Sequence, residues 1–275
     1  MNYDDTEVGS IEEFLAFVRD PMPVSASTTF IYRGQPSQYT SFEGHVFATL
    51  LMPSLYRQTL RLLGHDTIAS LEKRLLQDFM RESPPYLSRR PETTVQWMAL
   101  GQHHGLPTRL LDWTFNPLVA LYFAVTDTEC GVDANVYQAS VYDNQLYAGA
   151  TSGEPTPEDA FQLYAPEHLD ARLQVQSACF TLHPLMEFHD RDRFLQFFAE
   201  VTPKELGARR CRVLAGRFRA LKKELGVLGL TEKALFPGLD GLCRSILWKQ
   251  TGDMGALKDI VRIQRSIRNG EPSHP

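Results

Sequence analysis

The sequence has few cysteines and no long apolar run. Its four cysteines, Cys130, Cys179, Cys211 and Cys243, are far apart, and none of the gaps has the short spacing of a zinc site, so we expect no bound metal. No apolar stretch approaches the roughly 20 residues of a membrane-spanning helix, and none follows a basic start as in a secretory signal. These absences predict a protein of a reducing cytoplasm without a membrane partner.

Two catalytic motifs are also missing. The sequence contains no Gly-x-Ser-x-Gly elbow and no Gly-x-x-x-x-Gly-Lys-[Ser/Thr] run, so neither a serine hydrolase nor a P-loop NTPase is supported. Cys179 stands next to Phe180 in an apolar segment, which is typical of a buried, unreactive thiol.

The charge balance gives no global attraction to polyanions. Lysine and arginine number 28 against 33 acidic residues, for a net charge of -5, so any site for nucleic acid or anionic lipid has to be local. One basic segment, residues 204–223, contains Arg209, Arg210, Arg212, Arg217, Arg219 and Lys222. A solvated helix face is favoured there over a phosphate-binding patch, which stays as the alternative.

Helical and strand-like patterns alternate along the chain. Capping signals and apolar spacing predict helices over residues 10–21, 66–79, 94–103, 116–124, 214–225 and 232–248, the last broken at residues 237–238. Strands are expected over residues 27–32, 108–114, 134–142 and 172–182, and a loop over 144–157. Strands interleaved with helices predict a single α+β domain with a mixed or antiparallel sheet flanked by helices. The tail, residues 265–275, is expected to be flexible.

The most informative segment is residues 97–124. Two histidines, an arginine, an aspartate and a tryptophan stand between two helix-like runs. The first run ends at Gly105 and Pro107, whereas the second begins with Asn116 as N-cap and Pro117 in the first helical position. So short a turn with so many polar and aromatic groups is typical of the wall of a binding site.

Two stretches carry a resemblance to a known family. Phe30-Ile-Tyr-Arg-Gly-Gln35 and Gln102-His-His-Gly-Leu-Pro-Thr-Arg-Leu-Leu-Asp-Trp-Thr114 resemble the FRG domain, a bacterial family named for a Phe/Arg/Gly motif that here reads Tyr-Arg-Gly. Further fitting pieces are residues 53–57, Arg172 with Gln176, residues 180–183 and residues 235–242. The resemblance implies one FRG domain over residues 1–275, with a core at about 12–250.

The order of polar residues also resembles mono-ADP-ribosyltransferases. By that fold-level analogy, Arg33 on an early strand holds the phosphates or nicotinamide ribose of NAD, used as a substrate. Trp113 and Thr114 line the nicotinamide pocket, and Gln176 stands on a late strand where a carboxylate is expected.

A neutral amide at that place is a departure from the analogy. Cleaving the nicotinamide bond develops positive charge on the ribose, which a carboxylate stabilises far better than an amide does. Three alternatives follow: strain and positioning suffice without a carboxylate, Asp112 or Glu187 supplies the charge from elsewhere, or the Gln176 amide is itself the working group. We expect the amide to work, because the family resemblance includes it.

Four more residues are candidates for binding the cofactor. Gly34 lets a ligand approach the backbone, and Gln35 offers amide hydrogen bonds. One of His103 and His104 acts as a base or a hydrogen-bond donor, or else caps its helix. Arg109 is expected to bind anionic groups.

We expect Arg33, Gln35, Arg109, Asp112 and Thr114 to converge on one pocket, because an apolar core has no need of so many polar groups. The alternative for Arg33 is a structural arginine that pairs with Asp112.

The sequence thus favours an NAD-using ADP-ribosyltransferase or NAD glycohydrolase that acts as a bacterial toxin or antiviral defence effector. Its acceptor is a protein or a nucleic acid, and an antitoxin or defence-system partner is expected. The alternative is a non-catalytic sensor that binds a nucleotide or polyanion through Arg33, Arg109 and residues 204–223.

Overall fold

A seven-stranded mixed sheet organises the chain. The computed structural model describes residues 6–20, 28–36, 41–42, 45–46, 51–59, 67–126, 131–147, 155, 160–166, 171–187 and 191–252. In spatial order the strands are β1 (Glu7–Val8), β9 (Arg209–Val213), β6 (Ala134–Tyr142), β2 (Thr28–Gln35), β5 (Leu110–Thr114), β8 (Ala178–Leu182) and β7 (Leu163–Tyr164). The pair β1/β9 is parallel and the other pairs are antiparallel. β3 (Ser41–Phe42) and β4 (His45–Val46) form a separate pair.

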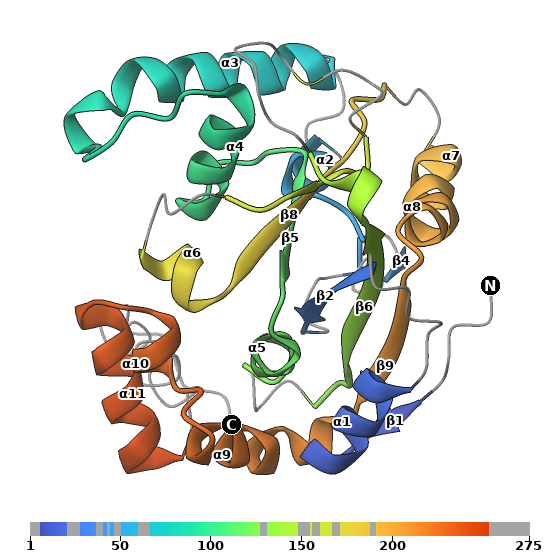
Figure 1. Ribbon diagram of the computed structural model, residues 1–275, viewed down its shortest axis with the longest axis vertical. Coiled ribbons are helices and arrows are strands. Elements are labelled where there is room, and N and C mark those ends of the chain that lie inside the picture. The colour runs from blue at the N-terminus through green and yellow to red at the C-terminus, as the bar shows by residue number, and fades with distance from the viewer. Residues whose placement is uncertain are drawn as a thin grey trace, which may run out of the picture.

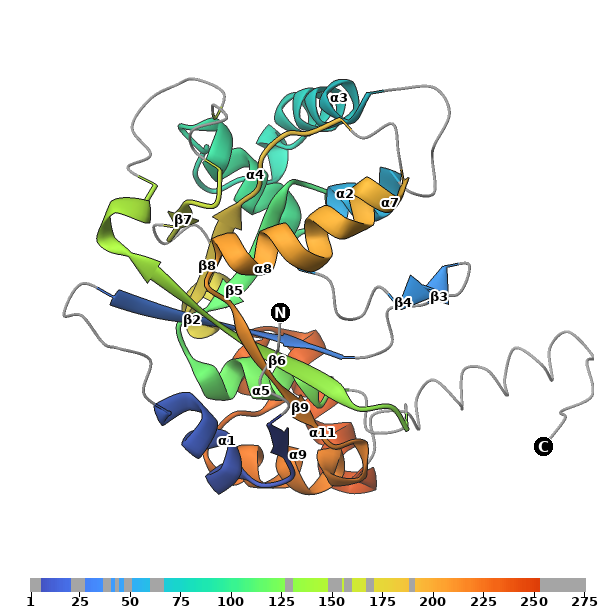
Figure 2. The ribbon, with the colours of Figure 1, turned by 90° about the vertical axis from the view of Figure 1, so that its right-hand side faces the viewer.

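Helices cover both faces of this sheet, which confirms the α+β prediction. In chain order they are α1 (Ile11–Arg19), α2 (Ser54–Thr59), α3 (Ile68–Glu82), α4 (Thr94–His103), α5 (Pro117–Ala124), α6 (Ala171–Val175), α7 (Arg191–Gln196), α8 (Thr202–Glu205), α9 (Phe218–Val227), α10 (Glu232–Leu235) and α11 (Leu239–Thr251). The elements are labelled in Figure 1. Figure 2 shows α1, α5, α9 and α11 on one side of the sheet and α2, α3, α4, α7 and α8 on the other. The largest cluster of buried apolar side chains lies between the sheet and the first of these layers.

Elements with strong local signals form as predicted. α4 has the predicted bounds, and the Oγ1 atom of its N-cap, Thr93, accepts a hydrogen bond from the Gln96 N–H at 3.2 Å. α5 begins with Asn116 as N-cap and Pro117 in the first turn. Strand β6 also has the predicted bounds. In the two helices a side-chain cap at the N-terminus fixes the first residue locally.

The strand predicted over residues 172–182 is wrong in its first half. The chain forms helix α6 up to Val175, turns at Gln176 and Ser177, and enters β8 at Ala178. Ser177 has a φ of 48°, in the left-handed region that commonly ends a helix. A short run of apolar residues suits a helix turn or a strand equally well, so the pattern could not separate them.

Other differences concern the basic segment and the helix ends. Residues 209–213 form strand β9 in place of a helix face, since Cys211 and Val213 alternate with outward arginines. Helix α9 begins only at Phe218, and α3 has Thr67 as its N-cap. The predicted cap Asp66, Cys130, the tail at 265–275 and most of the loop at 144–157 lie outside the described residues.

The contact that positions the site is between β2 and α5. Strand β2 pairs with β6 along its eight residues but with β5 at a single register position, Tyr32 opposite Thr114. Beyond that position the backbone of α5 lies against Gly34. A Cβ added to Gly34 would lie 1.8 Å from the Ala120 carbonyl oxygen and 2.7 Å from the Ala124 nitrogen. Only glycine allows this approach of two backbones.

Gly34→Ala is therefore expected to lower the free energy of unfolding by about 3 kcal/mol, because the new methyl group overlaps a backbone that cannot move aside. Urea unfolding followed by circular dichroism measures the change. Gly216→Ala is the matched control, since nothing lies within 4 Å of its added Cβ. Equal stability of the two variants would contradict the contact.

Candidate functional site

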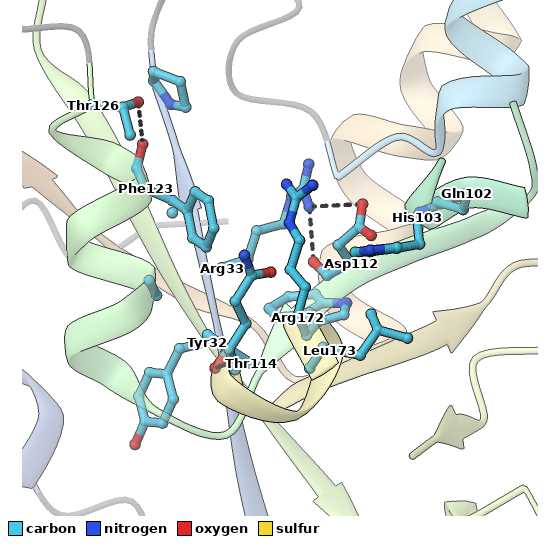
Figure 3. A pocket seen from close by; sticks show the side chains of 16 residues that line it. Tyr32, Arg33, Gln102, His103, Asp112, Thr114, Phe123, Thr126, Arg172 and Leu173 are labelled. Carbon is cyan, nitrogen blue, oxygen red and sulfur yellow. Dashed lines mark hydrogen bonds and ion pairs between the residues drawn. The ribbon is translucent and has the colours of Figure 1, made fainter. Parts of the chain in front are cut away.

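A pocket of about 340 Å³ lies where β2 and β5 part. It draws its walls from β2, the end of α4, β5, α5, α6 and the turn before β8 (Figure 3). The lining residues are Tyr32, Arg33, Gly34, Pro36, Gln102, His103, Asp112, Trp113, Thr114, Ala120, Phe123, Thr126, Arg172, Leu173, Gln176 and Ala178. Its size lies within the range of small-molecule sites, and its walls mix aromatic with charged groups.

Arg33 and Asp112 form a pair at the centre of this pocket. Arg33 Nη1 donates a hydrogen bond to the backbone carbonyl of Asp112 at 2.7 Å and lies 3.8 Å from the carboxylate Oδ2, as Figure 3 shows. The Arg33 side chain is 13% exposed and that of Asp112 is 58% exposed. The structural pairing considered for Arg33 is thus present, and the same guanidinium also lines the pocket. The Asp112 carboxylate is open to a ligand.

Thr114 uses its hydroxyl to hold the backbone at the foot of the pocket. Its Oγ1 donates to the Gln176 carbonyl at 2.7 Å and accepts a hydrogen bond from the Asn116 N–H at 3.0 Å. One side chain thereby joins the end of β5, the start of α5 and the turn after α6. The position fits the predicted site, but the hydroxyl is engaged by backbone groups.

Gln176 lies in the turn after α6 and not on a strand, contrary to the prediction. Its Nε2 donates to the Leu235 carbonyl at 2.9 Å, and its side chain is nearly buried. The amide therefore ties α6 to α10. A carboxylate at this place would face a carbonyl oxygen, which explains physically why an amide stands here.

Trp113 and His103 line the pocket from two sides. The buried indole of Trp113 donates from Nε1 to Thr181 Oγ1 at 2.9 Å, and Thr181 Oγ1 lies 3.3 Å from His183 Nε2. His103 faces the pocket from the end of α4, whereas His104 is the exposed C-cap of that helix. The two rings lie edge to face, 5.0 Å apart. His104 is thus the histidine that caps the helix, and the role of His103 as a base or donor stays a prediction.

Arg109 and Gln35 do not line the pocket, so the predicted convergence is wrong for these two residues. Arg109 lies in a separate cavity, where its Nε is 3.3 Å from Oε2 of the buried Glu72 of α3. It precedes β5 by one residue and projects away from Asp112. Gln35 is buried at the end of β2, opposite Asn135 of β6.

Gly34 borders the pocket, but the space above its α-carbon is filled by α5 and is not open to a ligand. Glu187, one of the two carboxylates considered for catalysis, caps α3 instead. Its oxygens accept hydrogen bonds from the Ile68 and Ala69 N–H groups at 3.1 and 3.0 Å. Asp112 is therefore the candidate carboxylate that the structure places at the pocket.

The basic segment at 204–223 contributes to folding contacts. Arg209 binds Asp20 at 2.9 Å and stacks on Phe17. Arg212 contacts Glu7 and Asp133. Arg217 donates to a backbone carbonyl of the β1–α1 turn, and Lys222 is buried. With these partners spread over several elements, the segment does not form a single phosphate-binding face.

Arg172 and Phe123 are lining residues that the sequence did not indicate as part of the site. Arg172 belongs to one of the stretches that resemble the family. The strand predicted there did not indicate that its side chain would line the same pocket as Arg33. Phe123 stands in an apolar helix, where an aromatic residue is ordinarily part of the core.

Burial shifts the pKa values of two side chains near the site. It lowers the pKa of His183 to about 3, with the Arg33 charge adding to the effect, so His183 is neutral. Burial also raises the pKa of the Cys179 thiol, which makes it unreactive as expected. Among the described residues, no group of three or more His, Cys, Asp or Glu side chains is placed to hold a metal, and no helix is long and apolar enough to cross a membrane.

Residues 28–131 match the family model of the FRG domain. The match runs from β2 past α5 and includes both Tyr32-Arg33-Gly34 and the block from Gln102 to Thr114. It stops before α6, so Arg172 and Gln176 lie outside it. No curated protein and no solved structure matches the chain, and the resemblance to mono-ADP-ribosyltransferases stays a prediction.

When the pH falls from 7 to 5, the free energy of unfolding is expected to decrease by about 2 kcal/mol because of His183 alone. Its folded pKa lies below the ordinary value of 6.5. Below pH 6.5 the unfolded chain therefore binds a proton that the folded chain does not, and stability falls as the pH falls. His183→Gln should flatten this slope in urea unfolding, whereas His104→Gln, at an exposed position, should keep it. An unchanged slope in His183→Gln would show that the ring is not protonated on unfolding.

Gln176→Glu is expected to destabilise the protein by about 1–3 kcal/mol, because the new carboxylate faces the Leu235 carbonyl without a donor. Gln174→Glu adds the same charge at an exposed position of α6 and should cost less than about 0.5 kcal/mol. Thermal and urea unfolding measure both. A Gln176→Glu variant as stable as Gln174→Glu would show that the amide does not hold α10.

Proposed function

We propose that the central pocket binds NAD and that the protein cleaves the bond between nicotinamide and ribose, passing ADP-ribose to a macromolecule or to water. One observation carries this proposal. A single pocket combines the guanidinium groups of Arg33 and Arg172 with an exposed carboxylate, Asp112. Arg33 suits the hydroxyls of the nicotinamide ribose and Arg172 a phosphate of the dinucleotide, because the planar fork binds two oxygens at once.

Asp112 is the residue we assign to the chemical step. When the C–N bond breaks, its electron pair leaves with nicotinamide and the ribose carbon becomes positively charged. An ionised carboxylate near that carbon stabilises the charge, which the Gln176 amide, donating to Leu235, is poorly placed to do. The oxygen or nitrogen of the acceptor then bonds to the ribose carbon and loses its proton.

His103 is the candidate base for that proton. It lines the same pocket as Asp112, and the imidazole ring is a common general base in enzymes. Trp113 and Phe123 supply flat apolar walls against which a nicotinamide ring packs. In the cell, this activity would suit a toxin or antiviral effector held in check by an antitoxin or a defence-system partner, with a protein or nucleic acid as its acceptor.

A sensor that binds a nucleotide without turnover is the second candidate. It is favoured by the engagement of the polar groups: Arg33 donates to Asp112, and the Thr114 hydroxyl and Gln176 amide donate to backbone carbonyls. A site whose polar side chains are already hydrogen-bonded within the protein can recognise the shape and charge of a ligand without supplying a reactive group. Arg109 and the basic segment, through which the sequence predicts such a sensor to bind, lie outside this pocket.

Asp112→Asn is expected to lower the release of nicotinamide from labelled NAD by about 100-fold or more, since one stabilising group for the developing charge is lost. The fold should persist, because the side chain is 58% exposed and the backbone carbonyl that binds Arg33 remains. Asp78→Asn is the matched control: this carboxylate is 61% exposed and pairs with Arg81 on α3. Release at the wild-type rate in Asp112→Asn would contradict the assigned role. Binding of NAD with no release in the wild type would establish the sensor.

A further inference from the structure

A second pocket adjoins the central one beyond Arg172. It has a volume of about 550 Å³ and is lined by Arg172, Phe236, Pro237, Gly238, Leu239, Asp240, Gly241 and Arg244. Arg172 borders both pockets. Figure 1 shows α6, which carries Arg172, next to α10 and α11.

Two guanidinium groups meet at one aromatic ring in this second pocket. The Cζ atoms of Arg172 and Arg244 lie 4.5 Å and 4.7 Å from the centroid of Phe236. Stacking on a ring fixes the plane of a guanidinium and keeps its N–H groups at the edge of the ring. Both arginines line the same pocket, and two oriented forks suit the oxygens of a phosphate.

Among the described residues around this wall, three cations, Arg172, Arg244 and Lys222, outnumber the two carboxylates of Glu232 and Asp240. Glu232 accepts a hydrogen bond from Arg244 Nε at 3.1 Å, but it also lies 3.5 Å from Nζ of the buried Lys222. One carboxylate thus serves two cations. Asp240 is the acidic residue in the pocket lining, against the two arginines. The chain as a whole has a charge of -5, so this excess is a property of the site.

The backbone of the pocket is held in one shape. Gly238 has a φ of 126°, which a side chain would strain, and a Cβ on Gly241 would lie 1.9 Å from the Phe236 carbonyl oxygen. Phe236 also packs edge to face on Phe123 of the central pocket, with centroids 6.0 Å apart. The hydrogen bond from Gln176 to the Leu235 carbonyl joins the turn after α6 to the residue before Phe236. The contacts of Phe236 and Gln176 therefore belong to a wall that the two pockets share.

We propose that the second pocket binds the pyrophosphate of the dinucleotide whose nicotinamide end occupies the central pocket. Arg172 and Arg244 hold the phosphate oxygens, and Arg172, shared by both pockets, sets the position of the ribose relative to Asp112. This inference rests on the proposed function for the identity of the ligand, whereas the anion site itself rests on the two arginines alone.

Titration calorimetry with inorganic pyrophosphate at low ionic strength tests the anion site directly. Arg244→Gln and Arg172→Gln should each weaken binding at least 10-fold, and Asp240→Asn should strengthen it several-fold. Arg89→Gln, which removes an exposed arginine paired with Glu92 far from the pocket, should stay within twofold of the wild type. Melting temperatures identify any variant that fails to fold. Arg172→Gln does not disturb Glu232, so it remains informative if Arg244→Gln unfolds.

The anion site would be overturned if the wild type did not bind pyrophosphate. It would also be overturned if the three pocket variants bound pyrophosphate as tightly as the control Arg89→Gln. NAD should displace bound pyrophosphate, and Arg244→Gln should weaken NAD while leaving nicotinamide riboside, which lacks a phosphate, within twofold. Simultaneous binding of NAD and pyrophosphate would overturn the assignment to the dinucleotide. Arginine-dependent pyrophosphate binding in a protein that does not bind NAD would leave the anion site standing and reject the proposed function.

Discussion

The incomplete pairing of β2 with β5 determines the shape of the site. β2 is fully paired with β6 but meets β5 only where Tyr32 lies opposite Thr114. Past that position the strands separate, and two residues of β2 fill the opening in different ways. Gly34 admits the backbone of α5, and Arg33 crosses to the Asp112 carbonyl with a hydrogen bond that replaces strand pairing. The pocket is the space that remains.

Elements with a signal inside a few residues were predictable from sequence. Asn116 followed by Pro117 fixes the start of α5 whatever the rest of the chain does. Strand β9 and the turn at Ser177 lack such a signal. Whether residues 209–213 form a strand depends on pairing with β6, more than 60 residues earlier in the chain, and local pattern holds no information on that partner.

The residues of the site also divide into those that local sequence predicts and those whose position depends on a distant partner. Arg33, Asp112 and Thr114 line one pocket, as the polar block before α5 indicated. Arg109 belongs to the same block, but the buried Glu72 of α3 pairs with it on the other side of the strand. A partner 37 residues away decides where that side chain points. Gln176 lines the pocket, but it stands in a turn where a strand was predicted, and its role as a tie to α10 depends on a distant carbonyl.

The two outer strands of the sheet are very short. In the part of the chain that the structure describes, β1 and β7 have two residues each, so each sheet margin offers few unpaired backbone groups to another chain. Long exposed margins invite strand addition and aggregation. A partner that extended the sheet from β1 or β7 would therefore find only two residues of each strand to pair with.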